Sequence, residues 1–461
     1  MSSKLGYLRS IAIGLASGAV VLALLIFGLN AGGAGSSNVA ANPAPTTPDN
    51  GSTPSVSPSS SPSASDGRTC SVAKLITDKR LGNFQAIVAN PATDEVLFDR
   101  GGETPAATAS VLKLITAAAA LQTLGPNYVI STNVYQDATD PGVIYLRGAG
   151  DPTLSRTRAG VQTVYKDAPK LSDLAIQVNQ ALAGQKVTKI VLDASLFSGP
   201  TWQPSWDGAE RTMGSTPLIT ALEADGDRAN PGAETSPRSL TPIENVGAWF
   251  KRALGATARG AKVQQAVTPN DATQIATVHS QPVSTLVKHM LLVSDNTEAE
   301  YLARQVAIKL GYSGSFTSID IALKKSLATT GLDFSNVTLI DGSGLSNNNR
   351  VAPVFFTQLM KLVLNSYGDF AIIGQGLPVS HESGSLASRF GGANLDAAGK
   401  IQAKTGWIKH GYTLAGIIHA KDGTDLTFAV YALGNVQDNA KDAIDNVVTG
   451  FYRCGNKLSN Q

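Results

Sequence analysis

Residues 107–116 read Ala-Thr-Ala-Ser-Val-Leu-Lys-Leu-Ile-Thr, and the rest of the chain is best interpreted around this stretch. Its composition favours a helix, which the pair Gly125-Pro126 ends. Lys113 is the only charged residue of this helix, and an ammonium group in an apolar setting tends to lose its proton or find partners. Ser110 lies three residues earlier on the same helical face, so the two residues are a candidate nucleophile and base.

Ser-x-x-Lys is a weak pattern alone, because Lys113 could equally be a surface lysine on a core helix. Two tripeptides change this interpretation. Ser294-Asp295-Asn296 interrupts an apolar helical pattern over 283–308, and Lys404-Thr405-Gly406 follows a strand-like segment. Each tripeptide alone is also an ordinary turn or helix N-cap. Together and in this order, the three motifs are typical of serine acyl transfer.

Different motif residues carry out the separate proton transfers of such a reaction. Ser110 attacks a carbonyl carbon, and Lys113 accepts the proton of its hydroxyl. Ser294 and Lys404 then relay a proton to the leaving amine.

The same motifs also provide the groups that hold a substrate. Asn296 holds the substrate amide, and Thr405 anchors a carboxylate together with Lys404. The backbone N–H groups of Ser110 and Trp407 would form an oxyanion hole, and Gly406 belongs to the same substrate-binding stretch.

At these motifs the chain resembles the penicillin-recognising serine D,D-peptidases. Within them it is most similar to the class C low-molecular-mass penicillin-binding proteins of type 4, which are D-alanyl-D-alanine carboxypeptidases and endopeptidases. The resemblance covers about residues 70–454 and includes the stretches LRGAGDPTL at 146–154, VLDASLF at 191–197, DGSGLS at 341–346 and GSLASR at 384–389.

The resemblance implies an α+β fold, in which a penicillin-binding transpeptidase-like domain has an antiparallel sheet covered by helices and is split by an inserted accessory domain. It implies peptidoglycan stem peptides as substrates, β-lactam antibiotics as inhibitors, and no cofactor or metal. Both removal of the terminal D-alanine and cleavage of D-amino-acid crosslinks are compatible with it.

Two positions depart from the family pattern. Asn347 stands where relatives commonly have an arginine that helps bind a diaminopimelic acid carboxylate, and Arg350 follows three residues later. Trp407 stands where Thr or Ser usually follows Lys-Thr-Gly, so a hydroxyl that could assist carboxylate binding is missing. Relatives also contact the diaminopimelic side chain through a Trp and an Asp of the insertion, which we match to Trp206 and Asp207.

Composition divides the chain into segments. Residues 1–10 predict a cytoplasmic tail, the uncharged run 11–29 a transmembrane anchor or signal sequence, and the Ser/Pro/Thr-rich segment 30–66 a disordered linker. A small-residue site at 39–41 leaves cleavage open, so the protein is either anchored or secreted, with its bulk on the extracytoplasmic face of the membrane or in the cell wall. The catalytic domain is expected at 67–136 and 271–461, and the inserted domain at 137–270.

The two cysteines of the chain, Cys70 and Cys454, lie at the two ends of the expected folded part. In an oxidising compartment they are expected to form a disulfide, and two buried free thiols are the alternative.

Local patterns predict strands at 85–89, 95–98, 128–135, 143–146, 189–193, 401–403, 414–419 and 428–433. They predict helices within 158–185, over 241–254 and on both sides of residues 294–296.

Other function classes fit less well. A net charge of +2 without a basic cluster argues against nucleic acid as a partner. The sequence has no Gly-x-Ser-x-Gly elbow and no pair of histidines at zinc-ligand spacing. A non-catalytic cell-wall binding module on the same fold is the main alternative, but the intact set of motif residues favours the enzyme.

Overall fold

The computed structural model describes residues 67–460. The expected tail, the uncharged run 11–29, the site at 39–41 and the linker up to residue 66 lie outside the described residues. Within 67–460, none of the helices combines the length and apolar character needed to cross a membrane.

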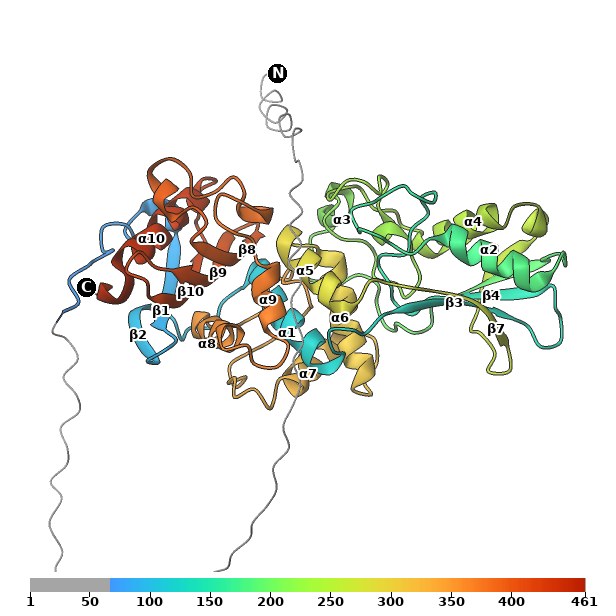
Figure 1. The fold of residues 1–461 in the computed structure, drawn as a ribbon, viewed down its shortest axis with the longest axis horizontal. Coiled ribbons are helices and arrows are strands. Elements are labelled where there is room, and N and C mark those ends of the chain that lie inside the picture. Colours follow the sequence, from blue (N-terminus) through green and yellow to red (C-terminus); the bar gives the residue numbers. More distant parts are fainter. Residues whose placement is uncertain (1–66, 461) are drawn as a thin grey trace, which may run out of the picture. The chain divides into compact units, whose positions relative to one another are not determined.

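The first of two five-stranded sheets is antiparallel throughout, in the order β2-β1-β10-β9-β8. Its strands are β1 (Asn83–Asn90), β2 (Glu95–Arg100), β8 (Ile401–Ile408), β9 (Gly411–His419) and β10 (Asp425–Leu433). The first and last strands of the chain therefore lie side by side (Figure 1).

Helices cover both faces of this sheet, because alternate side chains of a strand point to opposite sides. Phe428 and Val430 of β10 pack in one core with α10 (Ala440–Cys454). Ala429 and Tyr431 pack in the other core with α8 (Pro353–Leu364). The predicted α+β class with an antiparallel sheet between helices is confirmed.

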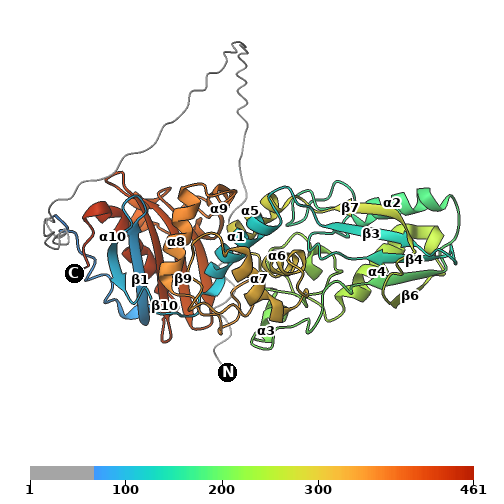
Figure 2. The same cartoon turned by 90° about the horizontal axis from the view of Figure 1, so that it is seen from below.

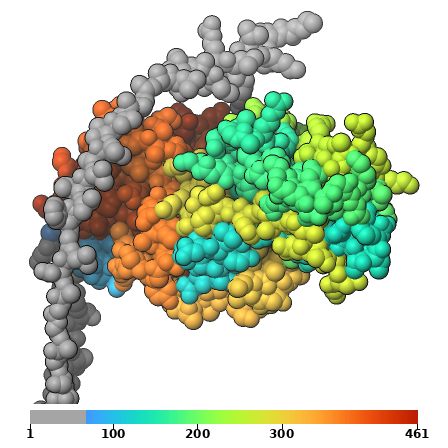
Figure 3. Space-filling view, turned by 45° about the vertical axis from the view of Figure 1, so that its right-hand side comes forward, coloured from blue at the N-terminus to red at the C-terminus, as the bar shows by residue number. Residues whose placement is uncertain are grey.

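Helix α1 (Lys113–Thr123) lies at the centre of the helical part and follows a 3-10 turn over Ala109–Leu112. Every residue from Lys113 to Leu121 is buried, as expected of a helix surrounded by others. Its neighbours are α5 (Val283–Val293), α6 (Asn296–Lys309), α7 (Ile319–Ser326) and α9 (Ala371–Gly376). The segment after α1 reaches the surface beside the start of α5 (Figure 3), where Ser284 N donates to Pro126 O.

The second sheet has the order β6-β5-β4-β3-β7 and is mixed, with parallel pairing of β4 to β5 and of β5 to β6 (Figure 2). Its strands are β3 (Ser131–Gln136), β4 (Val143–Arg147), β5 (Lys189–Asp193), β6 (Lys262–Gln265) and β7 (Thr273–His279). Helices α2 (Leu171–Leu182) and α4 (Pro242–Leu254) share a core with it, and the short α3 (Ala209–Met213) lies between β5 and α4 in sequence. The insertion boundaries at 137 and 270 stay a prediction, with β3 and β7 just outside them.

Two local expectations are corrected. Residues 158–170 are not helical, because Asp167 has φ 53° and Pro169 disfavours a helical conformation in the residue before it. The Lys-Thr-Gly motif does not end its strand, since Trp407 pairs with Tyr412 and carries β8 on to Ile408. Strands β6 and β7 had not been predicted at all.

Cys70 and Cys454 form a disulfide with Cα atoms 5.4 Å apart, so the predicted pairing is confirmed. It joins the first described segment to the end of α10. Backbone hydrogen bonds already hold these two segments together, from Cys70 N to Lys457 O at 3.1 Å and from Ser459 N to Cys70 O at 2.9 Å.

We expect the Cys70→Ser/Cys454→Ser variant to fold with a lower free energy of unfolding. Closing so long a loop contributes at most about 6 kcal/mol in the chain-entropy model. The backbone pairing of the two segments should keep the observed loss below that bound. Urea unfolding of both proteins measures the difference, and equal midpoints would contradict a stabilising role.

Candidate active site

Ser110 lies in the 3-10 turn before α1 and lines a cavity of about 330 Å³. The preceding residue, Ala109, has φ 46°, which is uncommon for a residue other than glycine. Two glycines make room for this turn. A Cβ added at Gly344 would lie 1.9 Å from Ala109 O, and one added at Gly406 would lie 3.0 Å from Ser110 N. The backbone around Ser110 is therefore fixed by close approach of two other motif segments.

Lys113 is fully buried at the start of α1, and its ammonium nitrogen has three oxygen partners. It donates to Ser110 Oγ at 2.9 Å, to Asn296 Oδ1 at 2.6 Å and to Ser343 O at 2.8 Å. Burial lowers the pKa of Lys113 to about 8, although the negative charges of Asp295, Asp341 and Glu300 oppose this shift. The surface-lysine interpretation is thus wrong.

Two buried carboxylates shape the loop that presents Ser343 O to Lys113. Glu300 Oε1 accepts from Gly342 N at 3.1 Å and from Ser343 N at 2.8 Å. Asp341 Oδ1 accepts from Gly344 N at 2.9 Å. Sequence reasoning missed Glu300, whose only signal is an acidic residue inside a largely apolar helical pattern.

Lys404 and Ser294 form the second lysine–serine pair of the site. Lys404 Nζ donates to Ser294 Oγ at 2.8 Å and to Thr405 O at 2.7 Å. Burial, together with the charge of Lys113, holds the pKa of Lys404 well below its usual value. Ser294 ends α5 in a left-handed conformation with φ 66° and lines the same cavity as Ser110.

The cavity also contains groups that the motifs did not predict. Ser385, from the stretch GSLASR, pairs its Oγ with Thr405 Oγ1 at 2.7 Å. Glu210 and Ser215 line the cavity from the insertion, and Ser215 O accepts from Asn296 Nδ2 at 3.1 Å. The remaining lining residues are Ser110, Ser294, Leu345, Ser388, Arg389, Gly406, Trp407, Tyr412 and Lys441. We had not predicted Glu210 or Ser215 at the site.

The two residues matched within the insertion do not lie in the cavity. Trp206 is 5% exposed, and its Nε1 donates to Asp341 Oδ2 at 2.8 Å, so the structure does not support a direct substrate contact. Asp207 is exposed and accepts from Ala209 N at the start of α3. Glu210 is the acidic side chain of this segment that reaches the cavity, two residues beyond Gly208.

The two departures from the family pattern have different surroundings. Trp407 is 55% exposed at the cavity wall. Arg350 donates to Asn347 O at 2.7 Å and to Asn349 O at 2.8 Å, so its guanidinium group is engaged by its own loop.

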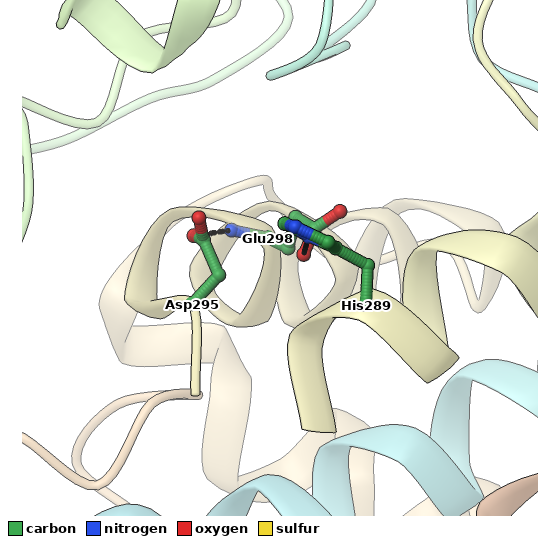
Figure 4. Close-up of side chains that lie close together, drawn as sticks. All are labelled: His289, Asp295 and Glu298. Atoms are coloured by element: carbon green, nitrogen blue, oxygen red, sulfur yellow. Dashed lines mark hydrogen bonds and ion pairs between the residues drawn. The ribbon is translucent and has the colours of Figure 1, made fainter. Parts of the chain in front are cut away.

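One cluster behind the site has the residue types of a metal centre: His289, Asp295 and Glu298 offer ligand atoms within 4.8 Å of one another (Figure 4). However, Asp295 Oδ2 accepts from Arg228 Nη2 at 2.5 Å, and His289 Nδ1 lies 2.7 Å from Glu298 Oε2. A guanidinium group in direct contact with one ligand would repel a cation. We therefore interpret these residues as an ion-paired cluster.

A serine and a buried lysine one helical turn apart, set against an antiparallel sheet between helices, define the class of penicillin-binding serine hydrolases. Residues 69–239 and 228–452 match the model of the D-Ala-D-Ala carboxypeptidase 3 (S13) family, and the chain belongs to this family. It is a D-Ala-D-Ala carboxypeptidase, and the family and the enzyme class expected from the motifs are confirmed.

Individual relatives agree with this family. The chain is 33% identical to carboxypeptidase DacB of Mycolicibacterium smegmatis over 84% of both proteins. It is 34% identical to a carboxypeptidase of Mycobacterium tuberculosis, over 90% of this chain and 89% of that protein. Penicillin-binding protein 4 of Haemophilus influenzae has the same fold, with a TM-score of 0.69, 20% identity and coverage of 80% of this chain and 96% of that one.

Proposed function

We propose that this carboxypeptidase removes the terminal D-alanine of peptidoglycan stem peptides through an ester on Ser110. The observation that carries the proposal is the position of Lys113 Nζ, 2.9 Å from Ser110 Oγ and 2.6 Å from Asn296 Oδ1. A buried amine in contact with a hydroxyl oxygen is the arrangement that general-base activation requires.

The reaction has two halves. Ser110 Oγ bonds to the carbonyl carbon of the penultimate D-alanine while Lys113 takes the hydroxyl proton. Backbone N–H groups of Ser110 and Trp407 stabilise the negative oxygen of the tetrahedral intermediate. The C–N bond then breaks, and the leaving amine receives a proton by way of Lys404 and Ser294. Water hydrolyses the ester, which releases the shortened peptide and restores the serine hydroxyl.

Substrate binding is assigned to the cavity walls. Asn296 holds the substrate amide, and Lys404 with Thr405 anchors its carboxylate, where Ser385 supplies a second hydroxyl 2.7 Å from that of Thr405. A crosslink has the same D-alanyl carbonyl with a different amine as the leaving group, so endopeptidase action would use the same groups.

We further propose that the enzyme is exported and inhibited by penicillins. The uncharged run 11–29 behind Lys4 and Arg9 is suited to export, whether it is retained as an anchor or cleaved. A β-lactam complex is known for the Haemophilus influenzae protein, which supports β-lactams as ligands of this site. A non-catalytic binding module has no observation in its favour.

The function is tested with the purified chain and a stem pentapeptide that ends in D-Ala-D-Ala. We expect release of one D-alanine per peptide, and a mass increase of one penicillin when the drug is added in place of the peptide. A matched pentapeptide ending in D-Ala-L-Ala is the control and should stay intact. Absence of both D-alanine release and the adduct from folded protein would contradict the proposal.

A further inference from the structure

A short segment of the insertion has an unusual backbone. Asp225, Gly226 and Asp227 are consecutive residues with φ values of 56°, 56° and 53°. Left-handed conformations are uncommon for residues other than glycine, and they persist where the surroundings fix them. Here Asp225 Oδ2 accepts from Arg156 Nη1 at 3.0 Å, and Asp227 Oδ2 accepts from Ser239 N at 2.6 Å.

This segment delivers Arg228 into a buried position. Arg228 is 2% exposed; its Nη1 donates to Tyr165 OH at 2.7 Å and its Nη2 donates to Asp295 Oδ2 at 2.5 Å. The left-handed glycine is required for this approach, since a Cβ at Gly226 would lie 2.6 Å from Arg228 Nη1 and 2.9 Å from Tyr165 OH. The backbone conformation of residues 225–227 thus positions the guanidinium group of Arg228.

Asp295, which receives this guanidinium group, belongs to the catalytic tripeptide but does not face the cavity. It is the N-cap of α6, and its Oδ1 accepts from Glu298 N at 2.9 Å (Figure 4). Burial would raise the pKa of Asp295, but the positive charges of Arg228, His289 and Arg238 hold it below the usual range. The carboxylate therefore stays charged and keeps the first turn of α6 in place.

The first residue of that turn is Asn296, whose amide must point in one direction to serve the site. Its Oδ1 accepts from Lys113 and its Nδ2 donates to Ser215 O of the insertion. A rotation of the first turn of α6 would move both contacts. Arg238 adds a second link between the insertion and α6. Its guanidinium group donates to Gly214 O at 3.2 Å, beside Ser215, and to Thr297 Oγ1 at 3.5 Å.

We propose that Arg228 is a positioning residue for acylation: it acts through Asp295 on the start of α6 and so aligns Asn296 with Lys113. The inserted domain then completes the active site. This inference rests on the proposed function, because it assumes that Asn296 and Lys113 take part in acylation of Ser110.

The test is the rate of acylation by a fluorescent penicillin as a function of its concentration. For Arg228→Met we expect the limiting rate to fall by about 10²-fold, as for a small misplacement of reacting groups. The half-saturating concentration should change less, because the walls formed by Thr405 and Trp407 are untouched. Arg228→Lys keeps a buried positive charge but not the planar fork, so its limiting rate should be intermediate.

Arg147→Met is the control, because it removes an Arg–Asp ion pair of the insertion without touching Asp295 or residues 225–228. It should acylate at nearly the wild-type rate. Asp295→Asn and the double variant Arg228→Met/Asp295→Asn complete a double-mutant cycle. If Arg228 acts through Asp295, the double variant is no slower than the slower single variant.

Several outcomes would overturn the inference: a wild-type limiting rate for folded Arg228→Met, an equal loss of rate for Arg147→Met, or multiplicative losses in the double variant. If Arg228→Met does not fold, the limiting rate of Arg228→Lys is compared with that of the wild type instead. A wild-type limiting rate for Arg228→Lys overturns the inference as well. Failure of the wild-type protein to be acylated would instead contradict the proposed function itself.

Discussion

Replacement of Ser110 by alanine is expected to abolish the penicillin adduct and to lower D-alanine release by about 10⁶-fold, the scale seen when a serine hydrolase loses its nucleophile. No other cavity serine is equivalent. Ser110 Oγ is the hydroxyl oxygen that accepts a hydrogen bond from Lys113. Ser110 also lies in the turn that Gly344 and Gly406 approach closely. Ser294 Oγ accepts its hydrogen bond from Lys404 instead.

Intact mass after incubation with penicillin measures this result directly. Ser388→Ala is the matched control, since Ser388 lines the same cavity and has no part in the proposed chemistry. It should form the adduct as wild type does. An adduct of the expected mass on folded Ser110→Ala would show that another residue is the nucleophile.

The motifs could be recognised from the sequence because each is local and each places its side chains by simple spacing. Ser110 and Lys113 are three residues apart, so a single helical turn brings them together wherever that turn lies. The order of the three motifs then suggested the family, and the family supplied the sheet and the insertion. The pairing of β1 with β10 is a contact between the two ends of the chain that no local pattern specifies.

The surroundings of the lysines could not be predicted in the same way. From the apolar residues around Lys113 we expected burial to lower its pKa, with the charge of Lys404 as a second cause. In the structure burial is the main cause, Asp295, Asp341 and Glu300 oppose it, and the charge of Lys113 acts on Lys404 instead. Asp295 and Glu300 lie at the start of α6 and Asp341 lies in a later loop, so the approach of all three to Lys113 depends on tertiary packing.

The insertion was the least predictable region. Trp206 was matched to a tryptophan that contacts the substrate in relatives. In the structure its ring packs between Trp202 and Phe316, with centroids 5.0 and 5.2 Å away. Neither Ser215 nor Arg228 belongs to a recognised sequence motif. Ser215 contributes a backbone carbonyl, and Arg228 acts through Asp295. Contacts of these kinds leave no residue pattern in a single sequence.

Lys113→Arg is expected to fold and to lose acylation by the roughly 10²–10⁴-fold typical of removing a general base, or by more. Arginine keeps the positive charge, but in a protein it does not give up its proton. In the wild-type protein the pKa of Lys113 is about 8, so its neutral form becomes the main form as the pH rises through that value. Acylation should therefore accelerate in one step near pH 8, and below it fall by about tenfold per pH unit.

Rates of penicillin acylation across this pH range test the assignment. Lys113 and Lys404 interact, so the step belongs to the pair as a whole. Burial and the charge of Lys113 lower the pKa of Lys404 as well. Lys441→Arg is the control, because Lys441 lines the cavity at an exposed position and should tolerate the change. If folded Lys113→Arg is acylated as fast as wild type, or if its rate still rises through pH 8, then Lys113 is not the base that activates Ser110.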